Sequence, residues 1–379
     1  MKCGMCNEDG LSLHKVEMIF IVESKNASDM NGVDKFKVAI RRESAPDLMK
    51  GIAVILMIQV HLMELFATVD IQQSALGKIS LFLGGPPAAP VFMAIMGYFV
   101  ARSQQSSWQK MALGVKLLVW GLLLNLGLNA HLLIRIISGD FDLNPWTYVF
   151  GVDILFLAGF SVIILTLAKR LFKDKWYLWF LLMLIFGFLN IFLPVYAGDI
   201  AWLKYVQAFF WGFYHWAYFS LFPWAAYPVA GYLFYLIANR FSLTTIHPRW
   251  RLLLAGLMLA LLLIFFNYGF NVASNLSVYY HHQGWFMMWT LLFLLLMLMA
   301  VSSLPEKLMS SHPFRYLQWV GKNVTAFYVF QWLIIGNIAT ALFQSQQWTG
   351  LMFWFGIVVL SSSLLVFTWQ KFRPLFGEK

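Results

Sequence analysis

Ten apolar stretches, each roughly as long as a membrane-crossing helix, constrain this chain more than any other feature of its sequence. A soluble protein of 379 residues could not bury a composition that is 60% hydrophobic and only 12% charged in one core. The sequence therefore predicts an all-α, polytopic integral membrane protein with ten transmembrane helices. The predicted helices are 51–68, 87–101, 112–136, 147–168, 176–196, 218–239, 252–270, 285–303, 317–341 and 348–369.

The Lys and Arg residues alternate sharply between the two ends of these predicted helices. Only Lys78, Arg135 and Lys204 fall on one side, and the other 24 of the 27 fall on the opposite side. Because short loops rich in Lys and Arg stay in the cytoplasm, this pattern predicts that both termini are cytoplasmic. The formal net charge of +10 then reflects topology, so we expect the lipid bilayer as a partner and no nucleic acid.

The first 45 residues are polar and charged, unlike the rest of the chain. Residues 1–45 are predicted to be a cytoplasmic arm, and residues 46–379 to be one transmembrane domain. Cys3 and Cys6 form a C-x-x-C pair in this arm, with His14 as the nearest further metal-ligand type. A structural zinc site needs four ligands, so we interpret the pair as two thiols and predict no metal site.

The first predicted helix carries an ionisable residue deep in the membrane. His61 follows Lys50 by eleven residues, which corresponds to roughly 16 Å along a helix. Lys50 is expected at the cytoplasmic rim with its ammonium group reaching the interface, and Glu64 shares the helix face of His61. An ionisable group at this depth marks a functional site or serves as a structural hydrogen-bonding residue between helices.

Two glycines and three prolines interrupt the start of the second predicted helix, between Gly84 and Pro90. The regular helix should begin near Pro87 to Pro90, at the level of His61, because prolines interrupt a helix interior. Irregular backbone at that depth is tolerated only beside an enclosed or watery cavity. The amides of Ala88, Ala89, Val91 and Phe92 are then candidate donors for an anion or oxyanion. A Pro-rich loop that caps an outward-facing helix is the alternative.

These two segments resemble the signature of transmembrane acyltransferases, which include the acyltransferase-3 and heparan-α-glucosaminide N-acetyltransferase-like families. The first segment is similar to L-D-x-x-R-G-x-A followed by a histidine, and the second to P-x-F-x-x-x-x-G-[FY]. The matching residues are Asp47, Gly51, Ala53, His61, Pro90, Phe92, Gly97 and Tyr98, and Lys50 stands at the position of the arginine. The stretch 319–328 is similar to a late helix of the same families.

The resemblance implies acetyl-CoA as the acyl donor, a CoA phosphate held at Lys50, and His61 as the central catalytic residue. Two residues depart from the family pattern. Lys50 replaces an arginine, which keeps the charge but loses the bidentate fork. Gln331 replaces a late-helix histidine and cannot act as a base.

Further candidate residues follow from their predicted depth or their loop. Asp153 and Gln331 are expected near the height of His61, where Asp153 could orient the imidazole and Gln331 could bind substrate. His281 and His282, in a predicted outer loop, could bind a sugar acceptor together with neighbouring tyrosines. The alternatives are that Asp153 is solvated at the outer interface and that the two histidines belong to an interfacial aromatic belt.

Two function hypotheses therefore remain. The first is an acyltransferase that moves an acetyl group from acetyl-CoA to a sugar hydroxyl or amine of a glycan or glycolipid. The second is a transporter or flippase for a glycan or lipid-linked substrate that binds at the broken helix. We favour the enzyme, located in a cell membrane such as the bacterial inner membrane, and leave a homo-oligomer as one alternative.

Overall fold

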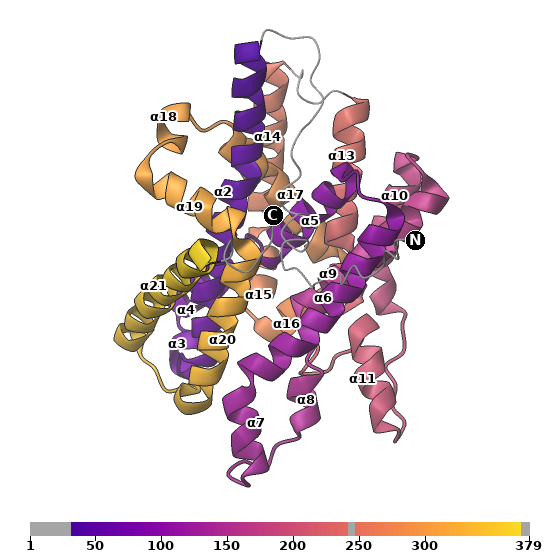
Figure 1. Ribbon diagram of the computed structural model, residues 1–379. Coiled ribbons are helices and arrows are strands. Elements are labelled where there is room, and N and C mark those ends of the chain that lie inside the picture. Colours follow the sequence, from indigo (N-terminus) through magenta and orange to yellow (C-terminus); the bar gives the residue numbers. More distant parts are fainter. Residues whose placement is uncertain (1–31, 242–246, 373–379) are drawn as a thin grey trace, which may run out of the picture.

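The computed structural model describes residues 32–241 and 247–372, and these two ranges form a bundle of helices without a β-strand (Figure 1). The fold is therefore all-α, as predicted. Most of the predicted N-terminal arm, including Cys3, Cys6 and His14, lies outside the described residues. The first described helix, α2, runs from Gly32 to Leu65 and passes through the predicted boundary at residue 45.

Eight helical segments of the described ranges are long and apolar enough to cross a membrane. They are Ser44–Leu65 of α2, Ala75–Arg102 (α4 and α5), Ser107–Leu128 (α6), Ile154–Phe172 (α9), Leu221–Arg240 (α12 and α13), Gly284–Ser302 (α17), Val324–Leu342 (α20) and Trp348–Phe372 (α21). A ninth candidate is the pair α14 (Pro248–Ile264) and α15 (Phe266–Ala273), which is bent by 65°. The shorter apolar helix α10 spans Trp176–Phe188.

Each of these ten elements overlaps one of the ten predicted apolar stretches, so the multi-pass membrane architecture is confirmed. The number of ten crossings and the cytoplasmic side remain predictions. The short helices connect the long ones and are α3 (Val69–Gln73), α7 (Ala130–Ile137), α8 (Pro145–Val149), η1 (Leu189–Ile191), α11 (Ala201–Phe210), α16 (Leu276–Tyr280), α18 (Glu306–Met309) and α19 (His312–Lys322).

The second predicted helix is longer than expected and is broken in its middle. The break was located correctly, because α5 starts at Ala89. A further helix that the sequence did not predict, α4, covers Ala75–Gly84 and precedes the break. The side chain of Ser74 accepts a hydrogen bond from the amide of Gly77 and so caps α4. The irregular backbone is therefore confined to Gly85–Ala88.

The ninth predicted helix, 317–341, is divided into α19 and α20 at Asn323. The Asn323 side chain donates to the carbonyl of Trp319 at 2.8 Å and so competes with regular helical bonding. The fourth predicted helix likewise begins only at Ile154, because Asp153 caps α9 with a hydrogen bond to the Ile154 amide. In both places a polar side chain at the junction sets the helix end.

Glycines bring α19 against α2, and α5 against α13. A Cβ atom on Gly51 would lie 1.8 Å from the carbonyl oxygen of Leu317, and one on Gly97 would lie 1.9 Å from that of Pro228. Such approach of two backbones is possible only without a side chain. Gly51 and Gly97 belong to the two sequence motifs, so part of each motif serves helix packing.

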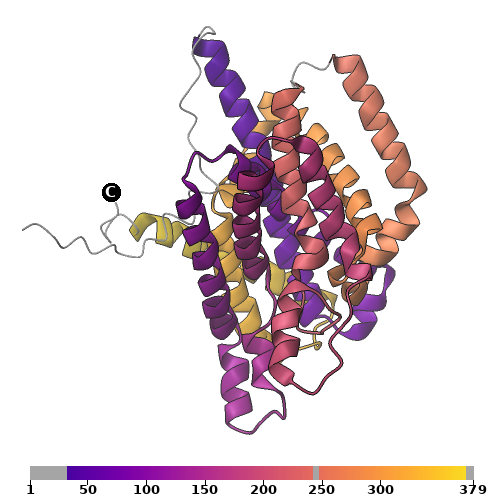
Figure 2. The same cartoon turned by 90° about the vertical axis from the view of Figure 1, so that its right-hand side faces the viewer.

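The bundle has two distinct ends. Helices α7, α8 and α11 lie together beyond one end, and α14 begins at the other (Figure 1). Figure 2 shows α14 standing apart from the rest of the bundle, and its leucines Leu252, Leu253 and Leu257 are exposed. An apolar exposed helix face of this kind suits contact with lipid.

Candidate active site

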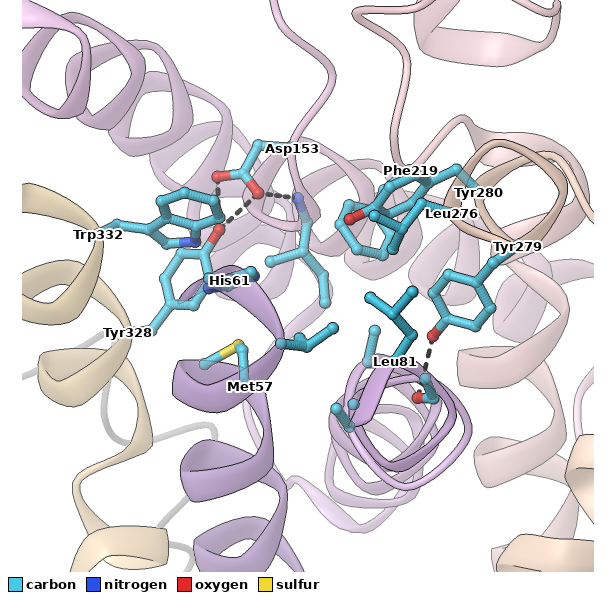
Figure 3. Close-up of a pocket in the computed structure, with 16 residues that line it drawn as sticks. Met57, His61, Leu81, Asp153, Phe219, Leu276, Tyr279, Tyr280, Tyr328 and Trp332 are labelled. Carbon is cyan, nitrogen blue, oxygen red and sulfur yellow. Dashed lines mark hydrogen bonds between the residues drawn. The ribbon is translucent and has the colours of Figure 1, made fainter. Parts of the chain in front are cut away.

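A cavity of about 470 Å³ of empty space lies where α2, α9, α16 and α20 meet the break between α4 and α5 (Figure 3). His61, Ala88, Ala89 and Asp153 are the sequence-predicted site residues that line it. Residues far apart in the chain are therefore brought to one place.

His61 is buried, with 8% of its surface exposed, and its ring lies against Trp332 with 4.0 Å between centroids and 34° between planes. Within the described ranges, its Nδ1 atom is buried and has no hydrogen-bond partner. His61 lies one turn before Leu65, where α2 ends, so the cavity is nearer to that end of the helix than to its middle. An imidazole with an unsatisfied nitrogen beside a cavity is free to bind or accept a proton there.

The break between α4 and α5 forms another wall of this cavity. Two of the four predicted amide donors are already used, because Ala88 donates to the carbonyl of Gly85 at 3.1 Å and Phe92 to that of Ala88 at 3.2 Å. The amides of Ala89 and Val91 have no acceptor among the described residues. Of the four predicted donors, only Ala88 and Ala89 line the cavity, whereas Val91 and Phe92 do not. The amide of Ala89, in the first turn of α5, is therefore the donor left for a ligand in the cavity.

Asp153 lies at the cavity but does not contact the imidazole as expected. Its carboxylate accepts hydrogen bonds from the hydroxyl of Tyr328 and, at 2.5 Å, from the amide of Ile154 (Figure 3). No hydrogen bond joins Asp153 to His61 within the described residues. The role of Asp153 in orienting or charge-stabilising the imidazole therefore stays a prediction, and in this structure α20 places the Tyr328 hydroxyl on the carboxylate.

Helix α16 supplies two adjacent tyrosines to the wall of the cavity. The hydroxyl of Tyr279 donates to the carbonyl of Gly85 at 3.0 Å, and that of Tyr280 donates to the Glu64 carboxylate at 2.9 Å. Glu64 itself does not line the cavity, so it reaches the site through Tyr280. The segment α16 thus connects the break to the helix that carries His61.

The comparison with family models fits this arrangement. The family model described as an acyltransferase domain, that of the acyltransferase-3 family, matches residues 43–369. The chain belongs to the acyltransferase-3 family. No curated protein and no solved structure is detectably similar to it. Membership makes the protein a multi-pass membrane acyltransferase, and it favours the enzyme hypothesis over the transporter.

His281 and His282 of this acyltransferase do not reach the cavity, although the tyrosines beside them do. His282 is buried, and its Nε2 lies 3.1 Å from the hydroxyl of Tyr227. His281 lines a second, smaller cavity with Trp211 and Phe213. Burial lowers the pKa of His281 below its ordinary value, and a hydrogen bond to the Tyr214 backbone opposes this shift. Their predicted role in binding the acceptor therefore has no geometric support at the main cavity.

The acyltransferase buries Lys50, so its ammonium group does not reach the interface as expected, and its position at the cytoplasmic rim stays a prediction. Its Nζ lies 2.8 Å from the Asp47 carboxylate and 5.8 Å from the centroid of the Phe99 ring, and none of the side chain is exposed. The close packing of α19 and α5 around α2 covers it. Gln331 is also fully buried and does not line the cavity.

Sequence reasoning assigned no role to two residues of α20 that line the cavity of the acyltransferase. Tyr328 and Trp332 are four residues apart, so they lie on one face of α20. Tyr328 belongs to the stretch that resembles the family's late helix. The four-residue spacing of Tyr328 and Trp332, next to Gln331 at the position of the replaced histidine, is the sequence feature that could have predicted them as site residues.

Proposed function

We propose that this acyltransferase transfers an acetyl group from acetyl-CoA to a sugar hydroxyl or amine of a glycan or glycolipid, with His61 as base or nucleophile. The observation that carries the proposal is the buried imidazole beside the broken helix, whose Nδ1 has no partner among the described residues. Imidazole is the side chain best suited to proton transfer near neutral pH.

In the direct route, the acceptor oxygen or nitrogen attacks the thioester carbonyl while His61 removes its proton. The carbonyl oxygen becomes an oxyanion, which the amide of Ala89 stabilises; such a donor contributes roughly 3 kcal/mol where measured. The tetrahedral intermediate then expels the CoA thiolate, which takes the proton from the imidazolium. In the alternative route, His61 attacks the thioester carbonyl and the carbon–sulfur bond breaks, so that CoA leaves as a thiol with the imidazole N–H proton. The acceptor then attacks the acetyl-imidazole, and its proton passes to the displaced imidazole.

The Tyr328–Asp153 pair supports the first route electrostatically. The Asp153 carboxylate lies at the same cavity as His61 and is held in place by the Tyr328 hydroxyl and the Ile154 amide. A fixed negative charge in a site of low dielectric favours the imidazolium that forms during proton transfer. Asp153 would act through space and not as the direct partner of the imidazole.

The donor would enter from the cytoplasmic side, with its thioester at His61, roughly 16 Å along α2 from Lys50. Because Lys50 is buried and pairs with Asp47 at 2.8 Å, it would bind a CoA phosphate only after its ammonium group leaves Asp47. The acceptor would enter from the opposite side, past α16. Transfer at this depth would carry the acetyl group across a cell membrane, which we assign to the bacterial inner membrane, without moving CoA.

Replacement of His61 tests the proposal. Purified protein in detergent is supplied with acetyl-CoA and with glucosamine, which offers both an amine and hydroxyls, and CoA release and acetylated sugar are measured. His61→Ala should reduce turnover at least about a hundredfold, the lower end for loss of a general base, with acetyl-CoA binding little changed. His61→Gln should not restore turnover, because an amide cannot take a proton.

His312 provides the matched control, since it is an exposed histidine at the start of α19 and outside the cavity. His312→Gln should keep the turnover of the unaltered protein. Near-normal turnover in correctly folded His61→Gln protein would refute the role of His61.

A further inference from the structure

The turn at the break, Gly85–Ala88, is held from outside by one side chain of α16. The hydroxyl of Tyr279 donates to the Gly85 carbonyl at 3.0 Å, across 194 residues of sequence. That carbonyl also accepts the amide of Ala88 at 3.1 Å, so both of its lone pairs are used. Pro86 and Pro87 have no N–H, so they cannot contribute donors to the turn.

This turn sets the direction in which α5 begins. The amide of Ala89 follows it directly and has no acceptor in the described part of the chain. A displacement of the turn by a fraction of an ångström moves this donor relative to His61. Donors that act on a transition state must be fixed before the reaction, because small misplacements reduce their effect steeply.

Tyr279 is itself held firmly in place. It is 4% exposed, and its ring packs edge-on against Trp224 at 5.4 Å and Phe286 at 6.0 Å between centroids. Trp224 also donates to the carbonyl of Tyr280 at 2.8 Å, which fixes the backbone of α16 next to Tyr279. The hydroxyl therefore occupies one position without needing a substrate to order it.

We infer that Tyr279 is a positioning residue for acyl transfer, which keeps the Gly85–Ala88 turn in the geometry that aims the Ala89 amide at the cavity. The inference rests on the oxyanion role of this amide under the proposed function. Because the oxyanion exists only after attack, loss of the Tyr279 hydroxyl should weaken the transition state and not the binding of either substrate.

Tyr279→Phe tests this by removing only the hydroxyl. Full-length protein in detergent is assayed with acetyl-CoA and glucosamine, and acetyl-CoA binding and thermal unfolding are measured on the same samples. We expect kcat to fall about tenfold, the rate equivalent of one neutral hydrogen bond, with both KM values changed less than twofold. Tyr316→Phe is the control, because its hydroxyl bonds to Ser363 at 2.8 Å between α19 and α21, away from the cavity.

An unchanged kcat in Tyr279→Phe would overturn the inference. A raised KM at constant kcat would also overturn it, because the hydroxyl would then contact substrate. Loss of acetyl-CoA binding or of the folded state would assign Tyr279 a merely structural role. His61→Ala in the same assay separates the two proposals. If His61→Ala is inactive and Tyr279→Phe is normal, only the positioning role fails, whereas an active His61→Ala protein refutes the proposed function itself.

Discussion

Replacement of Gly51 by alanine should separate α2 from α19, and the structure gives the size of the effect. The new Cβ would lie 1.8 Å from the carbonyl oxygen of Leu317, and Cβ contacts under 3.0 Å essentially do not occur. The two helices must therefore move apart by at least about 1.2 Å, since neither atom belongs to a flexible side chain. Overpacking of this kind typically costs 1–3 kcal/mol, so we expect a loss of about 2 kcal/mol in the free energy of unfolding.

The assay is thermal unfolding of purified protein in one detergent, where this loss should lower the midpoint by about 3 °C. Gly256 on α14 is the matched control, because a Cβ there would meet nothing within 4 Å. Gly256→Ala should leave the midpoint unchanged or slightly raised, because alanine is the better helix former. An equal midpoint for Gly51→Ala and Gly256→Ala would refute the argument that Gly51 permits the close contact of α2 and α19.

Two further predictions concern the donor site and the topology. Lys50→Ala should raise the KM for acetyl-CoA about tenfold, as expected for loss of a charge-assisted hydrogen bond. Lys50→Arg should retain or improve activity, because arginine keeps the charge. Equal KM values in the unaltered protein and both variants would contradict a role of Lys50 in phosphate binding. A reporter fused after Lys379 should be inaccessible from outside intact cells. The same should hold for a cysteine that replaces the exposed Asp174, between α9 and α10, in a variant without Cys3 and Cys6. External labelling at either position would contradict the cytoplasmic assignment.

The long helices were predictable because an apolar run of membrane length has few alternatives to a helix. The break at Gly85–Ala88 was predictable for a local reason as well, since three prolines cluster there. Helix α4 was missed because it is a ten-residue helix that contains Lys78 and so lacks the length and apolarity of a span. Sequence features that lie close together in the chain thus predicted the long helices and the break, because both depend on neighbouring residues.

The partners inside the cavity could not be predicted in the same way. Tyr328 and Asp153 are 175 residues apart, and Tyr280 and Glu64 are 216 residues apart. Their pairing depends on how far α9, α16 and α20 rotate and slide against α2, which single-sequence periodicity does not encode. Depth alone placed Asp153 and Gln331 at one height, and only the first of them turned out to face the cavity.

The contact between Gly51 and α19 also has a consequence for synthesis of the chain. Gly51 and Gly321 approach each other across 270 residues. At the usual rate of translation, α2 must wait roughly 15 to 55 s before α19 emerges. During that interval a lone ammonium group in α2 would oppose insertion, but Asp47 lies one turn before Lys50 and pairs with it at 2.8 Å. Helix α2 thus carries its own counter-ion, and it can enter the bilayer long before the segment that finally covers Lys50 has been made.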